Sequence, residues 1–242
     1  MNTTSVSHAE APIAEASLPK VLVWDFPVRV FHWLMVVSFA GAWLTAESER
    51  WRQVHVTLGY TMAGLVAFRI VWGLFGSRPA RFANFVRAPG AAARYVGSIL
   101  AGRAEHHTGH NPAGALAIVA LLLLAAGVTA SGWANFNEMG GHAMEEVHEA
   151  AANIMLAVIG IHLLGVAVGS WVHRENLVRA MVTGRKNGHP RDGAGRPWHL
   201  LGAALLAAVL GFWVMQWQSA PLALTGGGEA AAVHRTHDDD DD

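Results

Sequence analysis

Five long apolar segments constrain the fold of this chain more than any other feature. They span approximately residues 27–46, 54–75, 112–133, 147–172 and 198–217. A bilayer core about 30 Å thick requires roughly 20 apolar residues in a helix, so each segment is long enough to cross a membrane once. Only 14% of the residues are charged, whereas soluble domains carry about 25%. We therefore predict an all-α fold, a polytopic helical bundle within a membrane.

The charges between these segments predict how the bundle is oriented. Residues 76–111 contain five arginines and a single glutamate, and residues 174–196 contain five arginines and one lysine. The stretch that leads into the fourth segment is acidic and carries Glu138, Glu145, Glu146 and, at the start of the segment itself, Glu149. Because loops rich in arginine and lysine remain in the cytoplasm, we predict a multi-pass protein of the bacterial inner membrane, with a cytoplasmic N-terminus and a periplasmic C-terminus.

Histidine is the residue type that carries the chemistry of the spans. The chain has fourteen histidines and no cysteine, which excludes disulfides, cysteine-bound iron–sulfur clusters and covalently attached haem c. Ionisable side chains within a membrane are costly and are therefore functional candidates. Four histidines within the predicted spans are the candidates: His32, His55, His148 and His162.

The depth of these histidines predicts how they pair. His148 and His162 share the fourth span and are fourteen residues apart, so they face the same side about 21 Å apart along the axis. The predicted orientation puts His55 with His148 near the periplasm, and His32 with His162 near the cytoplasm. We predict that each pair is the bis-histidine site of a haem b. Iron ligated on both sides transfers electrons rather than binding oxygen.

Other side chains near the spans are candidates for supporting roles. Arg69 follows His55 by fourteen residues, so it is a candidate to bind the propionates of the inner haem; snorkelling to the interface is the alternative. Arg29 is a weaker candidate of the same kind. His142 competes with His148 as a ligand, and His173 competes with His162.

Small residues near the ligands admit either a macrocycle or close helix packing; they are Gly59, Gly64, Gly160, Gly165 and Gly169. We expect His106, His107 and His110 to be solvated in the cytoplasmic loop. No metal site is expected at His189, His199, His234 or His237.

The remaining chain divides around a four-helix di-haem core at residues 21–187. We predict a disordered cytoplasmic tail at 1–20, a fifth transmembrane helix within 188–220 and an acidic periplasmic tail at 221–242. A short interfacial helix is expected at 91–101. The acidic tail ends in Asp238–Asp242, a charge run that solvation alone explains; docking of a basic periplasmic protein is the alternative.

Several short motifs in the chain resemble one family. They are the stretches at 23–33 (VWDFPVRVFHW), 55–60 (HVTLGY), 68–73 (FRIVWG), 80–82 (ARF), 109–114 (GHNPAG), 147–149 (VHE) and 173–177 (HRENL), together with His162. In this order they are similar to the bacterial cytochrome b561 family, in the branch that contains the cytochrome b subunits of nickel–iron hydrogenases. The resemblance covers about residues 20–187 and implies a four-helix core with two haems b, whose ligands fall on His32, His55, His148 and His162.

The resemblance also implies a function in a respiratory chain. It implies electron exchange between membrane quinone or quinol and a periplasmic partner, either a c-type cytochrome or a hydrogenase-like subunit, with membrane lipid around the bundle and no nucleic acid. An electron-transfer subunit is favoured over a stand-alone oxidoreductase. One alternative is an enzyme that oxidises quinol and reduces oxygen to superoxide. Another is a non-haem transporter or membrane anchor, but Glu149 at the very start of the fourth span is the one acidic residue in the predicted spans, which argues against a proton pathway.

Overall fold

The computed structural model describes residues 19–103, 105 and 107–219. Both predicted tails, apart from residues 19 and 20, lie outside the described residues. The described chain is an all-α membrane bundle with five helices long and apolar enough to cross a membrane, as predicted. They are α1 (Phe26–Thr45), α2 (Arg52–Phe75), α5 (Pro112–Phe136), α6 (Gly141–Val172) and α8 (His199–Ser219).

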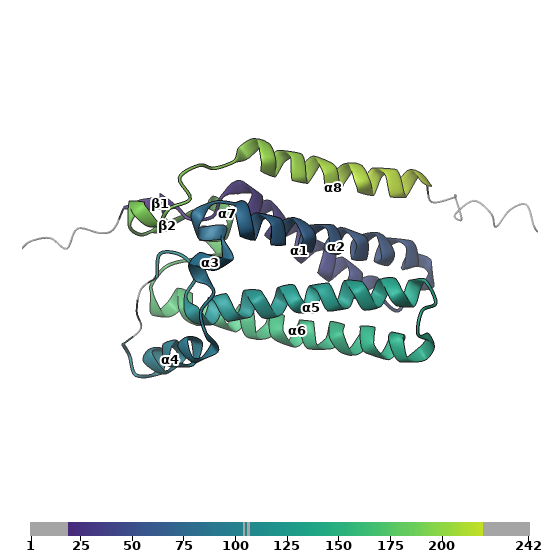
Figure 1. Ribbon diagram of the computed structural model, residues 1–242, viewed down its shortest axis with the longest axis horizontal. Helices are drawn as coiled ribbons and strands as arrows, with labels where there is room; N and C mark the ends of the chain where they lie inside the picture. Colours follow the sequence, from purple (N-terminus) through teal and green to yellow (C-terminus); the bar gives the residue numbers. More distant parts are fainter. Residues whose placement is uncertain (1–18, 104, 106, 220–242) are drawn as a thin grey trace, which may run out of the picture.

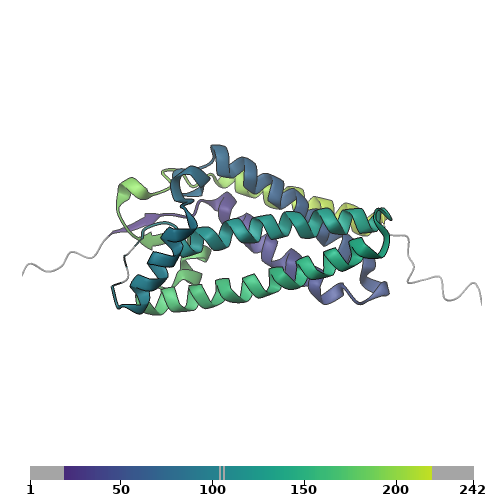
Figure 2. The ribbon, with the colours of Figure 1, turned by 60° about the horizontal axis from the view of Figure 1, so that its bottom comes forward.

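The long helices run along one direction (Figures 1 and 2). In the described chain, α1 packs on α2, α5 packs on α6, α2 also contacts α5, and α8 lies along α1. The backbones of α1 and α6 make little contact with each other. Residues 19 and 219, the ends of the described chain, lie at opposite ends of the bundle, as an odd number of spans requires.

Local sequence explains where these helices begin. Asp25 caps α1, where its carboxylate accepts a hydrogen bond of 2.9 Å from the Val28 N–H. Asn111 caps α5 in the same way and accepts from the Gly114 N–H at 2.7 Å. Both caps precede a proline in the first turn, where its missing N–H is harmless. Helix α6 begins at Gly141, six residues before the predicted start, because its first two turns are polar and give no hydropathy signal.

The shorter elements gather at one end of the bundle (Figure 1). They are β1 (Lys20–Leu22), the 3-10 turn η2 (Arg78–Ala80), α3 (Phe82–Phe85), α4 (Pro89–Leu100), α7 (Leu177–Thr183), β2 (Arg185–Asn187) and the 3-10 turn η3 (Pro190–Asp192). A further 3-10 turn, η1 (Glu49–Trp51), precedes α2 at the opposite end. The structure confirms the short helix predicted at 91–101 as α4. Strands β1 and β2 pair antiparallel and were not predicted, because three-residue strands show no periodicity.

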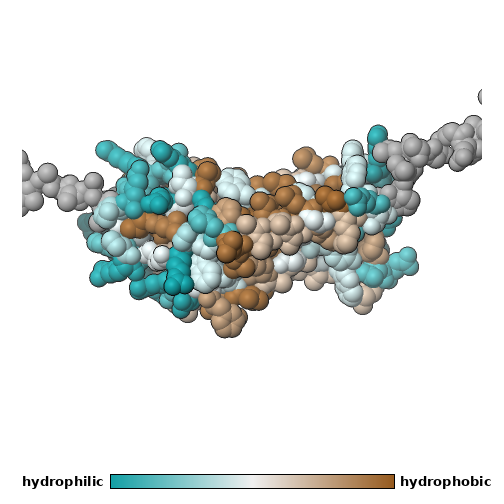
Figure 3. Space-filling view, turned by 90° about the horizontal axis from the view of Figure 1, so that it is seen from above, coloured by the Kyte–Doolittle hydropathy of each residue, from teal (hydrophilic) through white to brown (hydrophobic). Residues whose placement is uncertain are grey.

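The surface has the form that a membrane requires. Figure 3 shows an apolar middle between two hydrophilic ends. The main buried core lies between the helices at mid-height and consists of Phe39, Met62, Val66, Ala125, Val128 and Met155. This arrangement makes the chain a multi-pass membrane protein whose polar chemistry is concentrated towards the two ends.

Candidate functional site

The four candidate histidines are arranged around the buried core in steps of seven residues. Seven residues are almost two helical turns, so they advance about 10.5 Å and return nearly to the same face. On each of the three helices, the residue seven positions after a histidine is a buried residue of the core cluster. A second step of seven residues leads to the buried Arg69 on α2 and to His162 on α6. The series are His32 and Phe39 on α1; His55, Met62 and Arg69 on α2; and His148, Met155 and His162 on α6. Two histidine levels therefore flank one apolar layer.

The pair His55 and His148 has the geometry of two ligands to one metal ion. Their ring centroids are 6.1 Å apart and their planes differ by 80°. Metal–imidazole bonds are about 2 Å long, so one ion held between two imidazole nitrogens places the ring centres about 6 Å apart. The two residues that the sequence analysis paired lie close together in the structure. That they ligate one iron stays a prediction, and their spacing is compatible with it.

Backbone carbonyls fix both of these imidazoles. The His55 Nδ1 lies 2.9 Å from the Ala42 carbonyl oxygen, and the His148 Nδ1 lies 3.0 Å from that of Val128. A carbonyl oxygen only accepts, so each Nδ1 carries the proton and each Nε2 keeps the lone pair that binds a metal. Such outer contacts orient metal-binding histidines in general. Sequence reasoning found the two rings but not these carbonyl partners.

Gly132 on α5 makes room for the His148 ring. A Cβ at this position would lie 2.8 Å from the His148 Cε1 and 3.1 Å from its Nδ1. Any other residue would therefore push the imidazole out of place. Sequence analysis missed Gly132, because nothing in the α5 sequence marks which of its glycines faces α6.

The pair His32 and His162 lies at the other level. The two imidazoles are close enough to interact electrostatically, and the His32 Nδ1 is buried with no hydrogen-bond partner in the described chain. At Gly160 and Gly165, beside His162, an added Cβ would meet no atom within 4 Å. Both glycines are exposed on the surface of α6, so packing against another described helix does not explain them.

The comparison with protein families decides the class of this chain. Residues 23–184 match the family described as prokaryotic cytochrome b561. The chain belongs to this family. It is therefore a membrane electron-transfer protein with haem b, as the sequence resemblance indicated. None of the curated proteins and none of the solved structures matches it. Helix α8 lies beyond the matched residues.

Arg69 of this cytochrome is buried rather than extended to the interface. Its side chain is 3% exposed, Nη2 donates to the Ala80 carbonyl at 3.1 Å, and the guanidinium lies 4.8 Å from the Phe82 ring centre. Its Nη1 is buried without a hydrogen-bond partner in the described residues. The snorkelling alternative is therefore wrong, and Arg69 retains a donor for an anion such as a haem propionate.

Arg29 is directed to a different element. Its Nη1 donates to the Val182 carbonyl at 2.6 Å, near the C-terminal end of α7, where a positive charge is favourable. Its Nε is buried without a partner in the described part of the cytochrome. A role in binding propionate stays a prediction for this residue.

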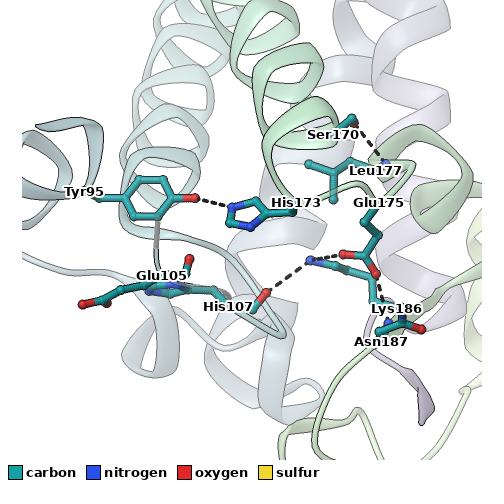
Figure 4. A network of polar contacts seen from close by, with 9 residues as sticks. All are labelled: Tyr95, Glu105, His107, Ser170, His173, Glu175, Leu177, Lys186 and Asn187. Atoms are coloured by element: carbon teal, nitrogen blue, oxygen red, sulfur yellow. Dashed lines mark hydrogen bonds and ion pairs between the residues drawn. The ribbon is translucent and has the colours of Figure 1, made fainter. Parts of the chain in front are cut away.

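The two competing histidines are engaged outside the pairs. His142 is 79% exposed and lies 3.3 Å from both Glu145 and Glu146. His173 follows the last residue of α6, and its Nε2 lies 3.1 Å from the Tyr95 hydroxyl of α4 (Figure 4). Burial raises the pKa of Tyr95, so this hydroxyl keeps its proton at neutral pH. Both contacts favour His148 and His162 as the ligands of the cytochrome.

A buried ion pair orders the end of the bundle near His173. The Lys186 ammonium is 3.3 Å from the Glu175 carboxylate and donates to the His107 carbonyl at 3.2 Å (Figure 4). Glu175 also accepts from the Asn187 N–H at 3.0 Å. Lys186 is 7% exposed, so it fastens the loop at residue 107 to β2.

His110 contradicts the expectation that the loop histidines are solvated. Its ring packs 4.5 Å from Trp24 and 4.3 Å from Phe85, and its Nδ1 is buried with no partner in the described chain. Burial, followed by the positive charges of Arg69 and Lys186 and by His162, lowers the pKa of His110 to about 3. His106 lies outside the described residues.

The sequence does contain a signal for the burial of His110. The residue directly precedes the helix cap Asn111, and side chains at that position often pack against the first turns of the helix. The polar composition of residues 102–111 hides this signal, because it favours a solvated loop up to the cap.

Proposed function

We propose that this cytochrome binds two haems b, an outer one between His55 and His148 and an inner one between His32 and His162. The 6.1 Å spacing of the outer rings carries the proposal. The seven-residue repeat supports the inner pair, since the same face of α6 presents both His148 and His162. The division into a di-haem core at 21–187 and a separate fifth span is part of the proposal.

Each haem supplies one-electron redox chemistry when bound, and the protein determines how it is used. Histidine on both sides fills the iron, which favours electron transfer over oxygen binding. Carbonyls of Ala42 and Val128 hold the outer rings in one orientation, so little rearrangement accompanies a change of charge. The layer formed by Phe39, Met62 and Met155 excludes water between the two levels.

We further propose that electrons pass between membrane quinone or quinol and a periplasmic redox protein. Acidic residues near His148 support this proposal, because Glu145, Glu146 and Glu149 are exposed at the same end of α6. Complementary charge speeds association, so this end suits a basic c-type cytochrome or a basic face of a hydrogenase-like subunit. The arginine-rich opposite end would then lie in the cytoplasm, with the bundle in the bacterial inner membrane.

Haem content tests the two-haem proposal directly. The pyridine haemochrome assay should give two haems b per purified wild-type chain, and one in each of the variants His148→Ala and His162→Ala. The matched controls His142→Ala and His173→Ala should retain two, because these side chains are engaged outside the pairs. Two haems retained in His148→Ala, or one haem lost in a control, would contradict the assignment.

A further inference from the structure

Two buried hydrogen-bond donors lie together at the end of the bundle that holds the inner pair. Arg69 comes from α2 and His110 from the residue before the α5 cap, and the positive charge of Arg69 acts on the His110 ring. Both are near the same aromatic ring: the Phe85 ring centre is 4.3 Å from the His110 ring centre and 5.9 Å from the Arg69 guanidinium. The Arg69 Nη1 and the His110 Nδ1 are both buried without a partner in the described residues.

The carboxylates nearby are already used by other groups. Asp25 is fully buried, and its oxygens accept from the Val28 N–H at 2.9 Å and the Trp72 Nε1–H at 3.1 Å. Glu175 is in contact with Lys186 at 3.3 Å. The Asp25 carboxylate offsets part of the Arg69 charge, but it leaves the Arg69 Nη1 and the His110 Nδ1 without an acceptor in the described residues. Buried donors left unpaired are costly, so a further acceptor is favourable here, and an anion suits the position beside Arg69 best.

The position of His110 identifies which anion this is. His162 acts electrostatically on both His32 and His110, so His110 borders the inner pair. The ring is partly covered by Trp24 and Phe85, which keeps bulk water from its Nδ1. A carboxylate attached to a group between His32 and His162 would reach both donors without entering from solvent.

We propose that Arg69 and His110 together bind one propionate carboxylate of the inner haem. The inference rests on the proposed function, because it requires a haem between His32 and His162. One carboxylate oxygen accepts from the Arg69 Nη1–H and the other from the His110 Nδ1–H, an arrangement in which both orphan donors are satisfied. Burial and the positive charge of Arg69 lower the pKa of His110, so the ring is a neutral donor until a carboxylate offsets that charge.

Redox titration of single-haem variants tests this assignment. The His148→Ala chain keeps only the inner haem, and the His162→Ala chain keeps only the outer haem. Adding His110→Phe, which keeps a ring between Trp24 and Phe85, removes the donor. The midpoint potential should fall in the His148→Ala background, because a propionate without its donor favours ferric iron. It should not change in the His162→Ala background.

Two further variants separate hydrogen bonding from folding. His110→Asn places an amide N–H near the former Nδ1 and should restore the inner potential. The control His107→Phe, in the same loop, should leave both potentials unchanged. The inference would be overturned by an unchanged potential in His148→Ala/His110→Phe, or by a shifted potential when His110→Phe is added to His162→Ala. If the wild type still held two haems, the proposed function would stand in either case. A wild-type chain without an inner haem would overturn both.

Discussion

Gly132→Ala should selectively disturb the outer haem. The new Cβ would lie 2.8 Å from the His148 Cε1, whereas ordinary carbon contacts lie at about 3.5 Å or more. The ring must therefore move by about 0.7 Å or more. Its Nδ1 is 3.0 Å from the Val128 carbonyl, and a shift of that size away from the oxygen takes the distance beyond the range of a hydrogen bond.

The expected loss follows from the role of that hydrogen bond. Removing an outer partner of a metal ligand weakens metal binding by about 10-fold to 100-fold. Helix propensity acts in the opposite direction, since alanine favours a helix over glycine by about 1 kcal/mol. If Gly132→Ala raised the stability of the protein but lowered its affinity for one haem, the loss would come from a steric effect on His148 and not from a weaker helix.

Gly127→Ala on the same helix is the matched control. A Cβ at Gly127 would meet no atom within 4 Å, so only the propensity effect should remain. Haem retention should be measured during titration with a haem-binding competitor such as apomyoglobin, with absorbance and thermal unfolding recorded for both variants. Equal retention of both haems in Gly132→Ala and Gly127→Ala would refute the reasoning.

The remaining predictions concern stability. Gly184 has φ 79°, and a Cβ there would lie 2.5 Å from the Trp24 carbonyl oxygen, whereas Gly195 has φ 71° and open space around it. Gly184→Ala should therefore cost more than the roughly 1–2 kcal/mol of left-handed strain expected for Gly195→Ala; equal melting temperatures would contradict this. Thr61→Val removes the acceptor of the 2.9 Å hydrogen bond from the Trp213 Nε1–H, which joins α8 to α2, and should cost about 1–3 kcal/mol. The control Thr129→Val loses only bonds within its own helix, and an equal loss of stability in both would show that Thr61 does not hold α8.

The sequence was sufficient to predict the spans and the outer pair because both depend on regular spacing. Twenty apolar residues specify a transmembrane helix whatever surrounds it. A fourteen-residue interval specifies the same helix face, so the spacing alone relates His148 to His162. The distance of 6.1 Å between His55 and His148 follows from this pairing once α2 and α6 share the core around Met62 and Met155.

What the sequence did not predict depends on contacts between distant segments. Strand β1 pairs with β2 near the other end of the chain, Lys186 reaches the Glu175 carboxylate and the His107 carbonyl, and His110 meets Trp24. The segments around Lys186 and His110 have the composition of polar loops, and β1 is too short to show a pattern. The partners that bury these segments lie elsewhere in the chain. Gly132 was missed for the same reason, since its importance comes entirely from the ring on α6.

Hydrogen bonds join the segments at this end of the bundle to the long helices α1 and α2. Asp25, in the motif that begins α1, accepts from Trp72 near the end of α2, and Arg69 one turn earlier donates to the carbonyl of Ala80. Three separated motifs are thereby fixed at the level of the inner pair. Within the described residues, the His32 Nδ1 has no partner corresponding to the carbonyl that orients His55. The outer pair is oriented by the helices themselves. The surroundings of the inner pair depend on this assembled end of the bundle, so loop residues there should tune the potential of the inner haem that we propose.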